Sequence, residues 1–251
     1  YPLEEGDELN GKLNADVSLK GKLSSIEKEK YEEFQAKGEL SITGMKYKGK
    51  DIKQPVLINN LKLLFSPQFI DMPVCDLKIG RSDLNARGRI DNLLSYIFKD
   101  ELLRGNFESK SRLLDINEFM SEETSPAAEN GAGESSLSVI EVPANIDFSL
   151  QSSFGRVLYD KMDMNNVNGK IKVANRKLTL ENLAMNVLDG TLDVNGYYST
   201  QKPDPEINLN LDASQLNIPK TFKTFVTVQK LAPIAEKCMG KVSAKINATS
   251  L

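Results

Sequence analysis

The sequence contains no histidine and no tryptophan, and only two of its 251 residues are cysteine. Without histidine the chain lacks the commonest general base, the usual partner of a nucleophilic serine and most zinc sites. It also lacks the glycine-rich loops that hold nucleotide phosphates and the G-x-S-x-G turn of serine hydrolases. We therefore expect that the protein is not an enzyme and that it uses no cofactor.

Carboxylates are the one catalytic group that the sequence holds in quantity, with 35 Asp and Glu residues. Most of them alternate with apolar residues, as on the solvated face of a strand. The acidic clusters at 4–8 and 160–164 lack the spacing of a calcium loop, so we expect no metal site. A hydrolase that uses paired carboxylates needs no histidine and stays open as a distant alternative.

The charges and the apolar runs exclude further classes. There are 32 Lys and Arg residues, the formal net charge is −3 and there is no basic block, so we expect no nucleic-acid partner. No stretch approaches the roughly 20 apolar residues that span a bilayer. The chain begins with tyrosine, and we expect it to be the soluble portion of a longer protein.

The two cysteines, Cys75 and Cys238, lie far apart in the sequence. They form no C-x-x-C motif and no disulfide framework. Two free thiols that pack as small apolar groups are the favoured interpretation, and a single long-range disulfide stays open.

Alternation of apolar and polar residues dominates the chain. It is clear in "NIDFSLQ" (145–151), "GKIKVAN" (169–175) and "EINLNLDAS" (206–214). This period of two predicts half-buried antiparallel strands. Asp189-Gly190 predicts a tight hairpin turn, and the phase of the alternation changes at Glu181-Asn182, which predicts a bulge.

Two stretches have helical spacing. Residues 91–103 begin with Asp91, a plausible cap. Residues 219–232 begin with Pro219, and Pro233 should end or kink the helix. We expect both helices to be short and to cover one end or one face of the sheet.

The apolar pattern occurs twice. Residues 76–92, "DLKIGRSDLNARGRIDN", match 184–200, "AMNVLDGTLDVNGYYST", at an offset of 108 positions. The match continues upstream and downstream with shifts only at loops. We predict a mainly β protein, with a long curved antiparallel meander sheet built from two repeated units and a few short covering helices.

The stretch "SEETSPAAENGAGESS" (121–136) has no large apolar residue and is typical of a linker or exposed loop. We therefore expect a first β unit at 1–120, a linker or loop at 121–137 and a second unit at 138–251. The second unit ends with the start of a further strand at 240–251.

Four stretches, 31–52, 79–120, 180–200 and 224–243, resemble the AsmA family in its Bacteroidetes form. The central element is N-L-x-x-x-x-L-x-G-x-L-x-x-x-G, which here runs from Asn182-Leu183 through Gly190 and Leu192 to Gly196. The first half keeps Gly88 but has Ser82 in place of Gly190.

The resemblance implies a periplasmic protein that an N-terminal helix, absent here, attaches to the inner membrane. AsmA-like proteins are similar to lipid carriers with a repeating β groove, and they are linked to outer-membrane biogenesis and lipid homeostasis. The family offers no catalytic residues to carry over.

Two functions follow as hypotheses. In the first, phospholipid or another envelope lipid binds along an apolar β groove. In the second, the apolar residues form a filled core with no lipid ligand, and the protein is a scaffold for outer-membrane protein assembly that pairs with envelope protein partners. The sequence fixes neither the lipid nor the oligomeric state. The candidate lipid-lining residues are Leu63, Phe65, Ile70, Met72, Leu77, Ile79, Leu84, Ile171, Val173, Leu178, Leu180, Met185, Val187 and Leu192.

Overall fold

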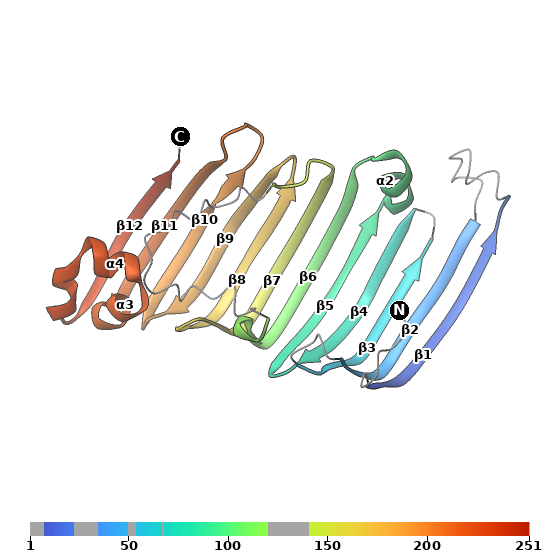
Figure 1. The fold of residues 1–251 in the computed structure, drawn as a ribbon, viewed down its shortest axis with the longest axis horizontal. Coiled ribbons are helices and arrows are strands. Elements are labelled where there is room, and N and C mark those ends of the chain that lie inside the picture. Colours follow the sequence, from blue (N-terminus) through green and yellow to red (C-terminus); the bar gives the residue numbers. More distant parts are fainter. Residues whose placement is uncertain (1–7, 23–34, 50–53, 67, 120–140, 251) are drawn as a thin grey trace.

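The computed structural model describes residues 8–22, 35–49, 54–66, 68–119 and 141–250. It is one open sheet of twelve strands that lie side by side in sequence order, as Figure 1 shows. The mainly β, largely antiparallel sheet predicted from the alternation is confirmed. The strands are β1 (Glu8–Lys20), β2 (Gln35–Lys48), β3 (Val56–Phe65), β4 (Phe69–Ile79), β5 (Ser82–Asp91), β6 (Leu103–Asp115), β7 (Ile146–Tyr159), β8 (Met162–Ala174), β9 (Lys177–Val187), β10 (Gly190–Ser199), β11 (Glu206–Asn217) and β12 (Lys241–Thr249).

One junction departs from a meander. β6 and β7 are parallel, with Phe107 opposite Leu150. Parallel neighbours cannot be joined by a hairpin, so the chain must return along the sheet after the short turn η2 (Ile116–Glu118). The linker predicted at 121–137 falls within this connection and lies outside the described residues.

The strands on either side of this junction repeat in length. Every bound of β4 and β5 reappears in β9 and β10 at one offset, from Phe69 and Lys177 (177 − 69 = 108) to Asp91 and Ser199 (199 − 91 = 108). The sheet itself continues from β6 to β7 without a break. The division into two repeated units therefore stays a prediction.

The predicted hairpin turn lies one residue earlier than expected. Leu188 and Asp189 occupy the turn with φ of 52° and 62°, and Gly190 is the first residue of β10. Glycine is needed at position 190 for lack of space and not for the turn conformation. A Cβ there would lie 2.3 Å from the carbonyl oxygen of Ser214 in β11. The bulge predicted at Glu181-Asn182 is confirmed by the φ of 50° at Asn182 and the shifted register around it.

The helix predicted at 91–103 is shorter than expected. α2 spans Leu93–Lys99, and Asn92, with a left-handed φ of 70°, precedes it. Asp91 does not cap the helix, because it ends β5, where it pairs with Phe69 of β4. The C-terminal part of the predicted helix is not helical, because Leu103 already belongs to β6 and pairs with Ile146 of β7.

The stretch predicted as one helix at 219–232 forms two. α3 (Ile218–Thr224) and α4 (Val226–Leu231) are separated by Phe225, whose backbone is extended, and Pro233 begins the 3₁₀ turn η4 (Pro233–Lys237). The β-branched residues around Phe225 weaken the helix there. None of the residues of α3 and α4 is buried.

The helices of the described ranges therefore do not form a second layer over the sheet. α2 packs beside β6, α3 beside β11, and α4 against α3 and η4. Within the described ranges, no helix is long and apolar enough to cross a membrane.

The close approach at Gly190 makes a testable prediction. Gly190→Ala should lower the free energy of unfolding by about 1–3 kcal/mol, because the methyl group would meet backbone atoms that cannot move aside cheaply. Thr191→Ala, at the neighbouring exposed residue, should cost less than about 0.5 kcal/mol. Urea unfolding followed by circular dichroism measures both. Equal stability of the two variants would contradict this account of the β10–β11 contact.

Candidate functional site: the apolar face of the sheet

The apolar side chains of successive strands lie in rows that cross the sheet. Because directly paired residues share a face, the register tells which side chains line up. One row crosses nine strands, including the parallel junction, without interruption. It consists of Met72, Gly88, Phe107, Leu150, Ile171, Leu180, Gly196, Leu209 and Ala248.

The fourteen residues predicted from the sequence all lie on strands β3–β5 and β8–β10. Pairs such as Leu77 with Leu84 and Val173 with Leu178 place them on this one face. Val187 is buried, at 4% exposure, and the other thirteen side chains are half-buried. Half-burial is what lateral contacts within one layer can provide when no second layer covers the face.

The sequence prediction omitted the middle and the margins of the face. Phe107 on β6 and Phe148 and Leu150 on β7 connect the two predicted groups of residues. The alternation in "NIDFSLQ" marked β7 as a strand, but a parallel neighbour across a long connection leaves no local signal of register. On the outer strands, Leu40 and Leu211 extend the same face.

Glycines keep the floor of this face shallow. A Cβ on Gly88 would lie 2.3 Å from the ring of Phe107, and one on Gly105 would meet the rings of Phe107 and Phe148. The two rings are 5.8 Å apart between centroids and meet edge to face. Large rings that lie across glycines give a low apolar surface on which another apolar molecule can pack.

The other face is solvated and charged. Its strand residues form ion pairs between neighbouring strands, and most of these side chains are exposed. Exposed pairs add little stability, so they serve chiefly to keep this face hydrated. They are Lys62–Glu39, Arg87–Glu108, Lys170–Glu181, Lys172–Asp147 and Lys245–Asp212.

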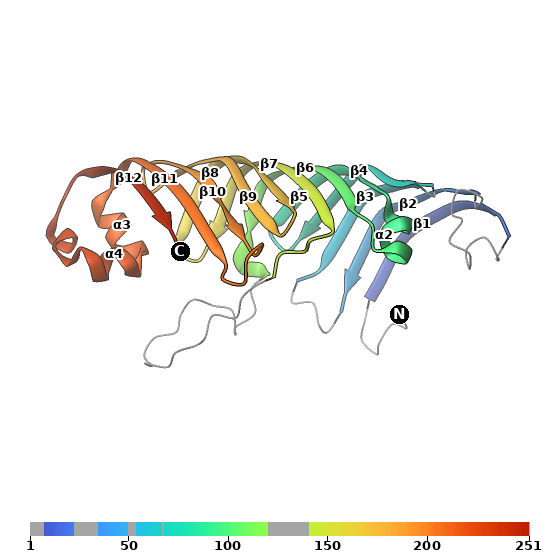
Figure 2. The ribbon, with the colours of Figure 1, turned by 90° about the horizontal axis from the view of Figure 1, so that it is seen from above.

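The sheet is arched, and the apolar face is the concave one. Figure 2 shows the arch from above, with α3 and the short turn η2 (light green) on its concave side. Ser82 lies on the apolar face, since it is paired with Ile79, and its hydroxyl donates to Glu118 of η2 over 2.8 Å. The apolar residues therefore line a trough.

A polar cluster lies at one margin of this trough, where β4 and β6 end. Asp115, 1% exposed, accepts from the guanidinium of Arg81 and from the backbone N–H of Asn117, and Glu118 accepts from the backbone N–H of Arg81. These bonds join the β4–β5 turn to the point where the chain leaves β6. The cluster therefore holds the junction in place.

Asp83 strengthens the same corner. Burial alone would raise the pKa of its carboxyl, but hydrogen bonds from the backbone N–H groups of Leu113 and Arg112, with the charge of Arg112, outweigh burial and lower it. A lowered pKa means that the ionised carboxylate stabilises the folded state.

The trough also contains a short polar stretch at the parallel junction. The hydroxyls of Ser109 and Ser152 lie 3.0 Å apart across β6 and β7. The buried hydroxyl of Ser111 has no hydrogen-bond partner among the described residues. The apolar floor continues past these serines through Phe107 and Leu150.

Little in the described ranges suggests covalent chemistry. They hold no group of three or more His, Cys, Asp or Glu side chains placed to bind a metal ion. Cys75 and Cys238 are both free thiols. Burial, with a smaller effect of Asp76, raises the pKa of the Cys75 thiol, which makes it a poor nucleophile. The dominant feature of this face is its apolar surface.

Comparisons with protein-family models, with curated proteins and with solved structures found no match for this chain. The AsmA resemblance therefore stays a prediction that rests on the sequence stretches quoted above.

The lowered pKa of Asp83 predicts a pH dependence. Asp83→Asn should lower the free energy of unfolding by about 1–3 kcal/mol at pH 7, because hydrogen bonds to a charged acceptor are lost. The ionised Asp83 carboxylate stabilises the folded state at pH values above the pKa of Asp83 in the unfolded chain, which is about 3.9. This stabilisation is lost as the pH falls through the lower pKa that Asp83 has in the folded protein.

The difference between the parent and Asp83→Asn should therefore shrink below about pH 4. Urea unfolding at a series of pH values measures it. A difference that stays constant down to pH 2 would show that the carboxylate charge is not what stabilises this corner.

Proposed function

We propose that the protein is a non-enzymatic lipid-handling module whose concave apolar face holds acyl chains. The observation that carries this proposal is the apolar row that runs unbroken across β4–β12 on a face without a second layer over it among the described elements. Soluble proteins rarely expose so large an apolar surface unless it binds something.

The dimensions suit an acyl chain. Twelve strands spaced about 4.8 Å apart give a trough roughly 50 Å long across the strands. A chain of about sixteen carbons that rests with half of its surface on the floor gains roughly 6 kcal/mol, from about 0.8 kcal/mol per methylene. This gain is large enough for binding without a specific polar contact along the tail, before the cost of association.

The resemblance to the AsmA family points in the same direction. The proposal places the protein in the periplasm, attached to the inner membrane by a segment outside this sequence, with a role in outer-membrane biogenesis and lipid homeostasis. In that setting a trough would shield acyl chains from water between two membranes.

The edge strands favour the second candidate, a scaffold for assembly. β1 and β12 each have one neighbour within the described sheet, and Leu13 on β1 and Ile246 on β12 are 57% and 50% exposed. An unpaired edge can add a strand from a partner protein. This candidate differs from lipid binding in that it does not need the middle of the trough.

Native mass spectrometry with lipid extraction of the same sample tests the proposal. The parent, purified from a bacterial host or incubated with phospholipid vesicles, should retain phospholipid at a fixed stoichiometry. A double variant, Leu77→Gln with Ile171→Gln, places two amides on the floor and should reduce the retained lipid at least tenfold, through lost apolar contact.

The matched control changes the next residue on each strand, which lies on the other face. Lys78→Gln with Lys172→Gln should leave lipid retention unchanged. Circular dichroism checks that both variants keep their strand content. A parent that stays free of lipid after incubation with vesicles would overturn lipid binding and leave the scaffold as the remaining candidate.

A further inference from the structure

The outer edge of β1 carries a regular pattern of charge. β1 and β12 are the two edges of the described sheet, as Figure 1 shows. The odd-numbered residues of β1 lie on the apolar face, since Ala15 is paired with Leu40, so the even-numbered residues lie on the charged face. Four of these are charged, and their signs alternate along the strand: Glu8, Lys12, Asp16 and Lys20.

The charges at the centre of β1 are not neutralised by β2. The residue paired with Asp16 is Glu39, which has the same charge and forms its own ion pair with Lys62. Lys12 is paired with Thr43, which is uncharged. Both Asp16 and Lys12 are exposed, and neither forms an ion pair with another described residue.

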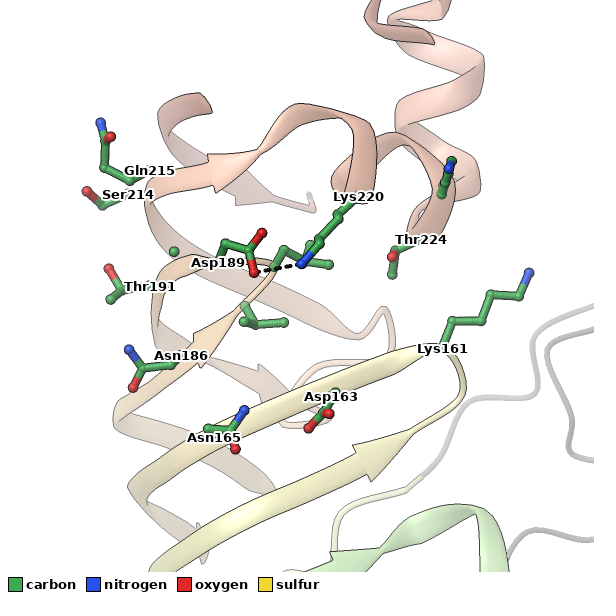
Figure 3. Close-up of a pocket in the computed structure, with 14 residues that line it drawn as sticks. Lys161, Asp163, Asn165, Asn186, Asp189, Thr191, Ser214, Gln215, Lys220 and Thr224 are labelled. Atoms are coloured by element: carbon green, nitrogen blue, oxygen red, sulfur yellow. Dashed lines mark hydrogen bonds and ion pairs between the residues drawn. The ribbon is translucent and has the colours of Figure 1, made fainter. Parts of the chain in front are cut away.

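Charges toward the other end of the sheet do have partners. A cavity of about 870 Å³ surrounds the tip of the β9–β10 hairpin there. Figure 3 shows Lys220 reaching Asp189 over 2.7 Å, and Asp163 accepts from Arg156 over 2.6 Å. The acidic residues of this cavity are therefore neutralised within the chain, as Asp16 is not.

The order of the charges makes β1 complementary to a second copy of itself. If two β1 strands pair antiparallel about a two-fold axis at Asn14, Lys12 of each copy lies opposite Asp16 of the other. Glu8 lies opposite Lys20 in the same way. Moving the axis to residue 12 or 16 brings like charges together. Moving it to residue 13 or 15 leaves each charge opposite a serine or asparagine, or beyond the end of β1.

The same pairing joins the two apolar faces. Leu13 would lie opposite Ala15 of the second copy, and Val17 opposite Gly11, so a large side chain meets a small one. Leu13 and Val17 are 57% and 48% exposed along this edge, and the second copy would cover part of both. Because directly opposite residues share a face, the troughs of the two copies would open on the same side.

β12 is a poorer partner for β1. Its charged residues are Lys241 and Lys245, which have one sign and the four-residue spacing at which the charges of β1 alternate. With one parallel junction among the twelve strands, β1 and β12 run in the same direction, so copies stacked head to tail would pair these strands parallel. Any register that places both lysines opposite charges of β1 places one of them opposite a lysine.

We propose that β1 is a homodimer interface, in which two copies pair antiparallel about an axis at Asn14 and join their sheets into one. The backbone N–H and C=O groups that point outward along the thirteen residues of β1 would then gain partners. The inference goes beyond lipid binding and does not depend on it. Its consequence is a trough that continues from one copy into the other.

Analytical ultracentrifugation of the lipid-free protein over a concentration series tests the inference. The parent should form a dimer and no larger species. Lys12→Glu places like charges together at two symmetric contacts and should raise the dimer dissociation constant at least about tenfold. Lys12→Glu with Asp16→Lys restores opposite charges and should restore the dimer. The matched control, Lys241→Glu, makes the same charge change on β12 and should dimerise as the parent does.

Cross-linking with a short bismaleimide tests the register. In a Cys238→Ser background, where the remaining Cys75 is buried, Asn14→Cys should give a covalent dimer because the axis places position 14 opposite itself. Asn10→Cys should not, since position 10 lies opposite position 18, eight residues or roughly 27 Å along the strand from its own copy. Circular dichroism checks that every variant keeps its strand content.

Four results would overturn the proposal. They are a parent that stays monomeric throughout the series, open-ended polymers of the kind that β1–β12 pairing gives, a dimer that Lys241→Glu weakens as much as Lys12→Glu does, and equal cross-linking of the two cysteine variants. Each of them leaves lipid binding untouched, because lipid retention is measured separately.

Discussion

Cross-strand register is the constraint on which the rest of this structure depends. No opposing layer among the described elements buries the apolar side chains of this sheet, so each side chain relies on its neighbours on adjacent strands. A slip of one residue in any strand would move that strand's apolar side chains to the charged face. The register holds across all twelve strands, including the parallel β6–β7 junction, where Phe107 lies opposite Leu150.

The same constraint explains the bulges and close contacts. Asn182 shifts the phase of β9, so that Leu180 and Leu183 share a face although they are three positions apart. Gly88 and Gly105 make room for the ring of Phe107 where a Cβ would collide with it. The corner of Asp115, Arg81 and Ser82 anchors the point where the meander is interrupted.

Local pattern was enough to predict most of the fold. The alternation in residues 145–151 and 206–214 and the bulge at Asn182 are properties of neighbouring residues, and the sequence displays them directly. The parallel pairing of β6 and β7 was not predictable, because a long connection joins the two strands and no local pattern in the sequence marks their register. The helix at 219–232 was predicted as one because its apolar spacing passes through Phe225, where the backbone is extended.

The candidate site was predictable in part for the same reason. The fourteen residues came from the two halves that repeat, and the register joins them through Phe107 and Leu150 of β6 and β7. The cavity at the β9–β10 hairpin gave no sequence signal, since two of its residues, Lys161 and Lys223, are 62 positions apart (223 − 161 = 62) and only the fold brings them to one cavity.

The central claim is that acyl chains lie on the concave face, and photo-cross-linking tests it most directly. A phospholipid with a diazirine in its acyl chain would be incubated with the protein, irradiated, and its adducts mapped by peptide mass spectrometry. The account predicts adducts on concave-face residues on both sides of the parallel junction, such as Met72 and Leu180. Adducts confined to the charged face, or to the edge strands β1 and β12, would contradict it.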